Sequence, residues 1–148
     1  PIGEICSRTV VISQRDDTVL EVAKLMRQHH VGNVVVVETR NGVKTPVGIV
    51  TDRDLVMEIL APELDHLAVT AGEIMVPVLA TVRENQGIYE SVQFMRAKGV
   101  RRMPVVDDKN GLVGILTLDD LLELLSEEML ALAGLVRNEQ KKEADTRR

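Results

Sequence analysis

The chain alternates short apolar runs with amphipathic segments, and this pattern predicts strands and helices in a fixed order. Apolar runs at residues 10–12, 34–37 and 48–50 have the length and the β-branched composition of buried strands. Residues 19–28 place apolar side chains at helical spacing, directly after Asp and Thr residues that suit a helix N-cap. A second helix is expected at residues 52–60. The pattern therefore predicts the order β-α-β-β-α.

The rest of the chain predicts the same order a second time. Strands are expected at residues 78–82, 103–106 and 114–116, and helices at residues 88–97 and 118–128. Apolar residues continue beyond this last helix to Val136, before the chain turns polar. The predicted layout is repeat 1 at residues 2–60, a linker at 61–71, repeat 2 at 72–127, and a C-terminal helical extension with a charged tail at 128–148.

The two halves also share sequence. Residues 3–6 (Gly-Glu-Ile-Cys) return as residues 72–75 (Gly-Glu-Ile-Met), and residues 47–55 return as residues 113–121. The offset changes by three residues within a polar turn, where hairpins tolerate insertions. One unit of about 60 residues buries little surface alone, whereas two units can cover each other's sheets. We therefore predict an α/β (α+β) chain in which both units form one pseudo-two-fold domain with a cleft where they meet.

Composition narrows the function classes. The chain has 148 residues and is 45% hydrophobic, which indicates a globular protein. One Tyr, one Phe and no Trp leave few rings for stacking on nucleobases, and the net charge of −5 disfavours nucleic acid and anionic membranes. No apolar run approaches the ~18 residues that span a bilayer, so no membrane insertion is expected. The lone Cys6 forms no internal disulfide, and residues 1–4 begin no signal peptide, so we expect a cytoplasmic protein.

The sequence contains no group of residues in a pattern typical of a catalytic or metal-binding site. His29 and His30 are adjacent near a helix end, so their side chains diverge and do not share one metal ion. His66 lies in the linker. No Ser or Cys stands in a nucleophile motif, and no phosphate-loop lysine motif occurs. We therefore expect no metal site, no catalytic cofactor and no enzymatic activity.

Both copies carry the pattern Gly-h-h-Thr-x-x-Asp, where h is hydrophobic, at the junction of the last strand and the closing helix. The Thr residues are Thr51 and Thr117, and the Asp residues are Asp54 and Asp120. Free N–H groups and the helix dipole at this position suit a phosphate, and an ionised Asp can accept both hydroxyls of a ribose. The glycine lets a ligand approach the strand closely. The alternative is that Thr and Asp only cap the helix.

This doubled motif resembles a tandem CBS-domain pair, also called a Bateman module. The resemblance rests on residues 48–54, 114–120 and 99–107 (Gly-Val-Arg-Arg-Met-Pro-Val-Val-Asp), and it extends over residues 2–127. It implies two packed β-α-β-β-α repeats that bind an adenosine compound in one or both clefts. AMP, ADP and ATP are the expected regulatory ligands, with S-adenosylmethionine as an occasional one. The resemblance implies a sensor that signals by conformational or oligomeric change and catalyses nothing.

The resemblance also assigns roles to residues. Asp54 and Asp120 would hold ribose, and Thr51 and Thr117 would touch ribose or phosphate. The resemblance implies that Arg101 and Arg102 would face the phosphates, so we expect the copy with Thr117 and Asp120 to be the stronger site. Copy one has Gly32 and Asn33 in the place of the two arginines, with Arg53 as its phosphate partner. Adenine would lie against Val11 and Val31 in the cleft of Asp120, and against Ala80 and Val100 in the cleft of Asp54.

Two hypotheses about how the chain acts on other proteins remain open. In the first, the chain forms a homodimer through apolar residues of the closing helices and acts on an effector protein. The residues concerned are Leu55, Ile59, Leu121, Leu122 and Leu125, although they could instead pack internally. In the second, the clefts are empty and the chain is a structural protein-interaction module that docks a partner through its helices, including residues 130–136. The sequence does not say which adenosine compound binds or how many clefts fill.

Overall fold

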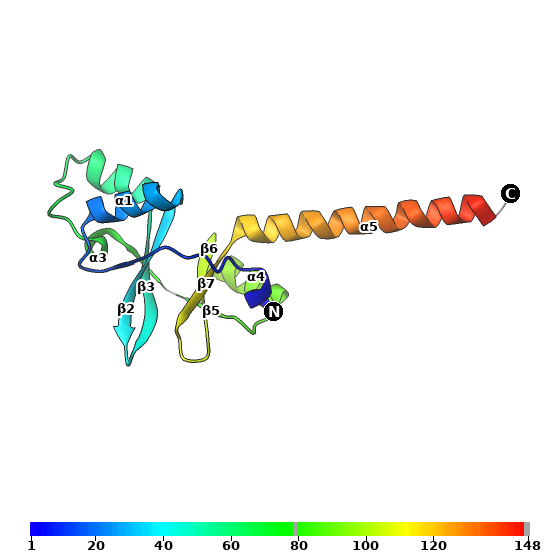
Figure 1. The fold of residues 1–148 in the computed structure, drawn as a ribbon, viewed down its shortest axis with the longest axis horizontal. Coiled ribbons are helices and arrows are strands. Elements are labelled where there is room, and N and C mark those ends of the chain that lie inside the picture. Colours follow the sequence, from blue (N-terminus) through cyan, green and yellow to red (C-terminus); the bar gives the residue numbers. More distant parts are fainter. Residues whose placement is uncertain (79, 147–148) are drawn as a thin grey trace.

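A computed structural model describes residues 1–78 and 80–146, and within them two sheets stand side by side (Figure 1). The first sheet has the order β1-β2-β3-β4, and the second has the order β5-β6-β7. The strands are β1 (Ile12–Gln14), β2 (Asn33–Arg40), β3 (Val43–Thr51), β4 (Val76–Pro77), β5 (Val82–Arg83), β6 (Arg102–Val106) and β7 (Leu112–Thr117). The helices are η1 (Ile2–Glu4), α1 (Val19–His29), α2 (Asp52–Leu55), η2 (Val56–Leu60), α3 (Ala71–Ile74), α4 (Ile88–Lys98) and α5 (Leu118–Thr146).

The two sheets are built alike, which confirms the predicted α+β fold of two packed repeats. In each, a short first strand pairs parallel with the second, and the second pairs antiparallel with the third. The register shifts at Val36/Val37 in β2 and at Val105/Val106 in β6, which are equivalent positions of the repeat. A β-bulge kept at the same place in both copies indicates one inherited strand geometry.

The segment at the start of each repeat pairs with the sheet of the other repeat. We call these the leading segments: the residues around Ser7 in the first repeat and strand β4 in the second. Strand β4, which precedes the second repeat's helix, pairs with β3 of the first sheet. In the same way, Ser7 forms an antiparallel bridge with Ile115 of β7 in the second sheet. The backbone bonds between Ser7 and Ile115 are 3.0 and 2.9 Å long. The repeats are therefore joined by backbone hydrogen bonds as well as by side-chain packing.

The core lies on both faces of the long first-sheet strand β2. Val34 and Val36 belong to a cluster that includes Val22 and Met26 of α1. Successive side chains of a strand point to opposite faces, and Val35 and Val37 accordingly meet Ile115 of the second sheet. All four valines of β2 are fully buried. This two-sided burial explains why residues 34–37 form an unbroken apolar run instead of an alternating one.

Helix α1 begins at the predicted residue, Val19, and ends at His29, one residue beyond the predicted end. Thr18 and Glu21 form a reciprocal capping box at its start. At its end His30 has a φ of 54°, a left-handed conformation that closes the helix as glycine often does. In the second repeat α4 ends in the same way, on Gly99 with a φ of 65°.

Three elements differ from the prediction. The apolar run at residues 78–82 is not one strand: β4 ends before it at Pro77, and β5 begins only at its last residue, Val82. Residue 79 lies outside the described residues. The helix expected at residues 52–60 is one α-turn followed by the π-helical segment η2. The closing helix and the C-terminal extension form one continuous 29-residue helix, α5, which projects away from the body (Figure 1).

Within residues 1–78 and 80–146, no helix is both long enough and apolar enough to cross a bilayer.

Candidate functional site

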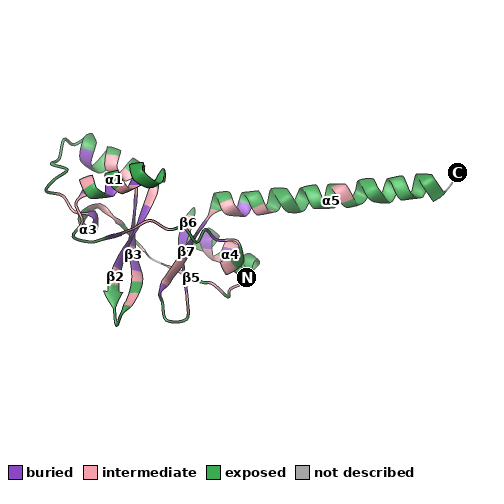
Figure 2. Cartoon of the chain, viewed as in Figure 1, coloured by how far each residue is buried: buried purple, intermediate pink, exposed green. Residues whose placement is uncertain are grey.

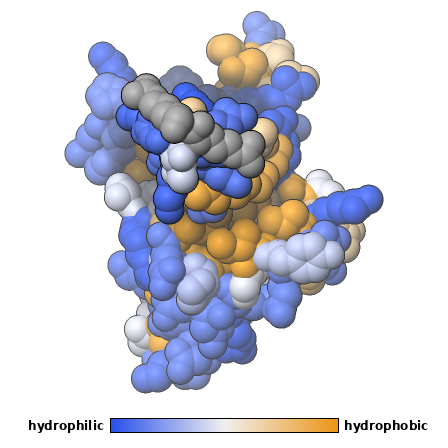
Figure 3. All heavy atoms as spheres, turned by 90° about the vertical axis from the view of Figure 1, so that its right-hand side faces the viewer, coloured by the Kyte–Doolittle hydropathy of each residue, from blue (hydrophilic) through white to orange (hydrophobic). Residues whose placement is uncertain are grey.

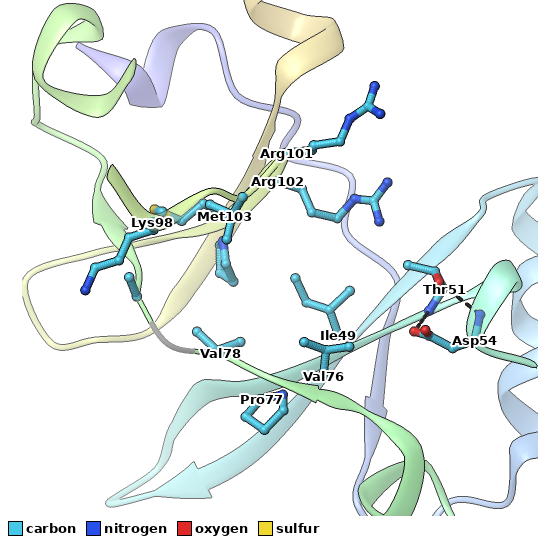
Figure 4. A pocket seen from close by; sticks show the side chains of 13 residues that line it. Ile49, Thr51, Asp54, Val76, Pro77, Val78, Lys98, Arg101, Arg102 and Met103 are labelled. Atoms are coloured by element: carbon cyan, nitrogen blue, oxygen red, sulfur yellow. Dashed lines mark hydrogen bonds between the residues drawn. The ribbon is translucent and has the colours of Figure 1, made fainter. Parts of the chain in front are cut away.

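A pocket of about 370 Å³ opens between the two sheets and draws residues from both repeats (Figure 4). This volume lies within the ~300–1,000 Å³ typical of small-molecule sites. Its lining is Ile49, Thr51, Asp54, Val76, Pro77, Val78, Ala80, Lys98, Val100, Arg101, Arg102, Met103 and Pro104. One side is apolar, one end carries Thr51 and Asp54, and the start of β6 contributes the arginines.

Thr51 and Asp54 hold each other in place at the start of α2. The backbone N–H of Thr51 donates to Oδ2 of Asp54 over 2.8 Å, and the N–H of Asp54 donates to Oγ1 of Thr51 over 3.1 Å. These reciprocal bonds form a capping box, so Thr51 and Asp54 do cap the helix, as the alternative interpretation of the motif expects. Among the described residues, only Oδ2 of this carboxylate takes part in the cap. The second oxygen is left to accept a hydrogen bond from a ligand.

Thr117 and Asp120 repeat the same geometry at the start of α5. The N–H of Thr117 donates to Oδ2 of Asp120 over 3.2 Å, and the N–H of Asp120 donates to Oγ1 of Thr117 over 3.1 Å. The two caps are therefore matched in structure. Their surroundings are different, because only Thr51 and Asp54 line the pocket described above.

Arg101 and Arg102 line the pocket of Asp54, whereas the sequence leads us to expect them beside Thr117 and Asp120 of their own repeat. Arg102 is also the cross-strand partner of Thr117 in the β6–β7 ladder. Arg101 and Arg102 come from the second repeat, and Figure 4 shows the guanidinium of Arg102 directed toward the end of the pocket that holds Thr51 and Asp54. The reason is the face-to-face packing of the sheets, which sets the start of β6 across from the end of β3. The residues at the start of β6 thus share a pocket with the Thr-x-x-Asp motif of the first repeat.

Arg102 has an unusual electrostatic position in this pocket. Its Nε is buried and has no hydrogen-bond partner among the described residues. A buried donor without a partner is costly, and a charged donor more so, which makes the group a ready partner for an anion. Lys98, at the end of α4, adds a third cation to the lining. The sequence analysis did not identify Lys98, although it stands two residues before Val100, which was assigned to this cleft.

The remaining predicted residues have more ordinary surroundings. Val11 and Val31 are partly buried and pack against the core cluster of the first repeat. Arg53 is exposed beside the Thr51–Asp54 cap and does not belong to the lining of the Asp54 pocket. Ala80 and Val100 do line that pocket, as expected for the cleft of Asp54.

The glycine of each motif is needed because another segment of the chain lies against it, and not because a ligand approaches it. A Cβ added to Gly114 would lie 2.7 Å from the carbonyl oxygen of Ser7 and 2.8 Å from Sγ of Cys6. A Cβ added to Gly48 would meet the side chain of Met75, which is the repeat equivalent of Cys6. The glycines are therefore required where the leading segment of the opposite repeat crosses the strand.

The thiol of Cys6 is buried beside Gly114 in the core of the second repeat. Burial raises the pKa of this thiol, and the nearby Arg8 acts in the opposite direction by favouring the thiolate. The charge of Asp120 adds a smaller effect that raises the pKa of Cys6 further. Cys6 is thus a packed core residue of the second repeat.

Comparison with known proteins agrees with this architecture. The model of the CBS domain matches residues 2–61 and again residues 71–127. An uncharacterized protein of Methanopyrus kandleri, MK0525, is 37% identical over 123 residues, which are 83% of this chain and 61% of that protein. The chain thus spans less than two thirds of this relative's length.

Two solved structures share the fold. The CBS domain pair of protein MJ0100, in complex with 5-methylthioadenosine and S-adenosyl-L-methionine, has a TM-score of 0.71 and 25% identity, and the match covers 86% of this chain and 96% of that one. The hexameric CBS-CP12 protein of bloom-forming cyanobacteria has a TM-score of 0.70 and 28% identity, and covers 82% of this chain and 65% of that one. The paired motifs, the two equivalent sheets and these matches show that the chain belongs to the CBS-domain family and carries two of its domains in tandem.

Proposed function

We propose that this chain is a regulatory module that binds an adenosine nucleotide, AMP, ADP or ATP, in the cleft of Asp54. One observation carries the proposal: Asp54 of the first repeat and Arg101 and Arg102 of the second repeat line the same pocket. A carboxylate suits the ribose hydroxyls and a pair of guanidinium groups suits phosphate, so the two ends of a nucleotide would find complementary partners.

The proposed pose follows from the lining. The ribose hydroxyls donate to Asp54, which the cap holds rigid. The adenine lies against the apolar wall formed by Val76, Val78, Ala80 and Val100. The phosphates meet Arg101 and Arg102. Lys98 lies on the opposite side of the pocket, with its ammonium over the ring of Phe94 (Figure 4). Because these groups come from both repeats, a bound nucleotide would favour one arrangement of the repeats by its differential affinity, which is how a regulatory ligand acts.

The cleft of Thr117 and Asp120, with Val11 and Val31 as its adenine contacts, is proposed as the weaker site. The positions equivalent to the arginines are Gly32 and Asn33, and Gly32 lies against the carboxylate of Asp52. Arg53 belongs to the other motif, where it stands between Thr51 and Asp54. A neutral or acidic neighbourhood is less suited to phosphate than a pair of arginines.

The charge of the pocket also favours phosphates over a sulfonium. The lining holds three cationic side chains and one carboxylate. The relative MJ0100 was solved with 5-methylthioadenosine and S-adenosyl-L-methionine, so a positively charged adenosine compound is the natural competitor. We propose that the cationic lining of this chain selects against it.

A homodimer is the proposed working form, with an effector protein as the receiver of the signal. Ile59 and Leu121 are buried within the chain, so they are part of its own core and not of a dimer surface. Leu122 and Leu125 are exposed, and these two remain candidates for contact with a second copy. No catalytic role is proposed for any residue of the chain.

The experiment is a calorimetric titration of adenosine, AMP, ADP, ATP and S-adenosylmethionine into the full chain and into Arg102→Ala. We expect the three nucleotides to bind the unmodified chain at least tenfold more tightly than adenosine or S-adenosylmethionine, and Arg102→Ala to remove most of that preference. Equal affinity for adenosine and ATP would reject the phosphate assignment. Absence of binding by all five would favour the alternative, a protein-interaction module whose clefts stay empty.

A further inference from the structure

Two hairpin turns of the chain carry the dipeptide Asn-Gly. Among the asparagines of the sequence, only Asn41 and Asn110 are followed by glycine. Asn41 lies between β2 and β3, and Asn110 lies between β6 and β7. Both hairpins point to the same side of the molecule (Figure 1), and their tips are exposed (Figure 2). Figure 3 shows mainly hydrophilic side chains at this lower end of the molecule.

An asparagine followed by glycine is open to an internal reaction, because glycine has no Cβ to keep its nitrogen away from the asparagine side chain. The main-chain nitrogen of the glycine attacks Cγ of the asparagine and loses its proton, and the side-chain nitrogen leaves as ammonia. Water then opens the resulting succinimide ring at one of its two carbonyls, so aspartate or isoaspartate replaces the asparagine. The glycine nitrogen must therefore be free to give up its proton and to approach Cγ.

The turn at Asn41 leaves this nitrogen free. Asn41 and Gly42 have φ values of 52° and 77°, the positive pair typical of a two-residue type I′ hairpin. Among the described residues, no acceptor forms a hydrogen bond with the N–H of Gly42. A Cβ added to Gly42 would meet nothing within 4 Å, so the space beside it is open.

The charge around Asn41 also favours the reaction. Asn41 lines a pocket of about 410 Å³ between the two hairpin tips together with Arg40 and Lys109, and the described lining contains no acidic residue. Arg40 pairs with Glu38, whereas Lys109 forms no ion pair with any described residue. Nearby positive charge stabilises both the deprotonated nitrogen and the carboxylate that the reaction produces.

The turn at Asn110 holds the corresponding nitrogen in place. The N–H of Gly111 donates to Oδ1 of Asp107 over 2.9 Å, and the N–H of Asp107 donates to the carbonyl oxygen of Gly111 over 2.9 Å. Gly111 is buried, and a Cβ added there would lie 3.0 Å from both Oδ2 of Asp107 and Cγ1 of Val43. A hydrogen bond to a carboxylate is strong and keeps the proton on the nitrogen. The two turns thus share the dipeptide but differ in the freedom of its nitrogen.

From the free nitrogen, the open space and the cationic surroundings of the first turn, we infer that Asn41 is a site of spontaneous deamidation in the folded chain. Asp107 protects Asn110 from the same reaction. Deamidation of Asn41 adds a negative charge between the hairpin tips, and isoaspartate also lengthens the main chain within a turn of two residues. The inference does not depend on nucleotide binding.

The test incubates the full chain at pH 8 and follows each asparagine by peptide mapping with mass spectrometry. When the chain is unfolded in guanidinium chloride, both asparagines are expected to react at similar rates, because both precede glycine. In the folded chain we expect Asn41 to react at least about tenfold faster than Asn110, the effect of one charge-assisted hydrogen bond. Equal rates in the folded chain would overturn the inference. So would an unreactive Asn41 in the folded chain under conditions in which the unfolded chain reacts.

Two neighbouring carboxylates separate the effect of the hydrogen bond from that of charge. Asp107→Ala removes the acceptor of the Gly111 N–H, whereas Asp108→Ala removes an equal charge from a carboxylate that does not accept this N–H. We expect Asp107→Ala to raise the rate at Asn110 about tenfold and Asp108→Ala to leave it nearly unchanged. The rate at Asn41 is the internal control and should be the same in both variants. Equal effects of the two substitutions on Asn110 would contradict the protective role of Asp107.

Discussion

Asp54 combines a structural and a proposed binding role in one carboxylate. Its Oδ2 accepts the N–H of Thr51, which fixes the side chain at the start of α2 without any ligand. Asp120 does the same for α5. A group that is already oriented loses little entropy when it accepts a ligand hydroxyl, so the cap preorganises the site. The capping and binding interpretations of the motif are therefore complementary at Asp54.

The matched caps lead to a prediction about stability. Asp54→Ala and Asp120→Ala each remove one carboxylate from a capping box of nearly equal geometry. We expect each to lower the free energy of unfolding by about 1 kcal/mol, the usual effect of a lost cap. Urea denaturation of both variants measures this. A difference of several kcal/mol between them would show that the two carboxylates do not have equivalent structural roles.

Cys6 leads to a prediction about reactivity and pH. Because burial raises the pKa of its thiol, the folded chain holds the proton to a higher pH than the unfolded chain does. The resulting stabilisation is fully present below the pKa of an unfolded cysteine and is lost as the pH rises through the folded value. We expect iodoacetamide at pH 8 to modify the native chain at least about tenfold more slowly than the chain unfolded in urea. Equal rates would contradict the buried position of Cys6.

At the scale of elements, the regular segments were predictable because their periodicity is local. The capped helix α1 and the valine run of β2 follow directly from spacing and composition. Strands β4 and β5 did not, because β4 exists by pairing with β3, which lies far away in sequence. The π-helical segment η2 and the unbroken course of α5 carry no breaker residue that would reveal where one element ends.

The contact between the leading segment at Ser7 and Gly114 of β7 can be tested by substitution. We expect Gly114→Ala to lower the free energy of unfolding by roughly 1–3 kcal/mol, because the new Cβ meets the backbone of Ser7. Gly134 of α5 has open space at the same position, so Gly134→Ala should stabilise the helix by up to about 1 kcal/mol. Thermal denaturation of the two variants compares them directly. A harmless Gly114→Ala would mean that the leading segment does not lie against β7.

At the scale of the whole molecule, the sequence predicts the local motifs of the candidate site but not which groups lie across the pocket from them. The Thr-x-x-Asp motifs are local patterns, and both are placed at helix starts as expected. The partner of each motif depends on which repeat faces which strand end, and this is set by packing between the sheets. From the sequence, Arg101 and Arg102 are expected beside the motif of their own repeat, whereas in the structure they line the pocket that holds Thr51 and Asp54. Their suitability for phosphate is evident from the sequence.

The exchange of leading segments predicts that both repeats unfold together. The first repeat's Ser7 bonds to β7, and the second repeat's β4 bonds to β3, so neither sheet is complete alone. We expect the amides of β2 and β6 to lose protection from hydrogen exchange at the same urea concentration, as in a two-state transition. Two separate midpoints would indicate that the repeats are independent domains.

The central claim is that the nucleotide site lies at Asp54, and the most direct measurement compares two variants with matched caps. ATP is titrated calorimetrically into the unmodified chain, Asp54→Ala and Asp120→Ala. We expect Asp120→Ala to keep the strong site with little change, and Asp54→Ala to weaken it at least tenfold. If Asp120→Ala abolishes the strong site while Asp54→Ala leaves it intact, the nucleotide binds at the other motif and the assignment of the pocket is wrong.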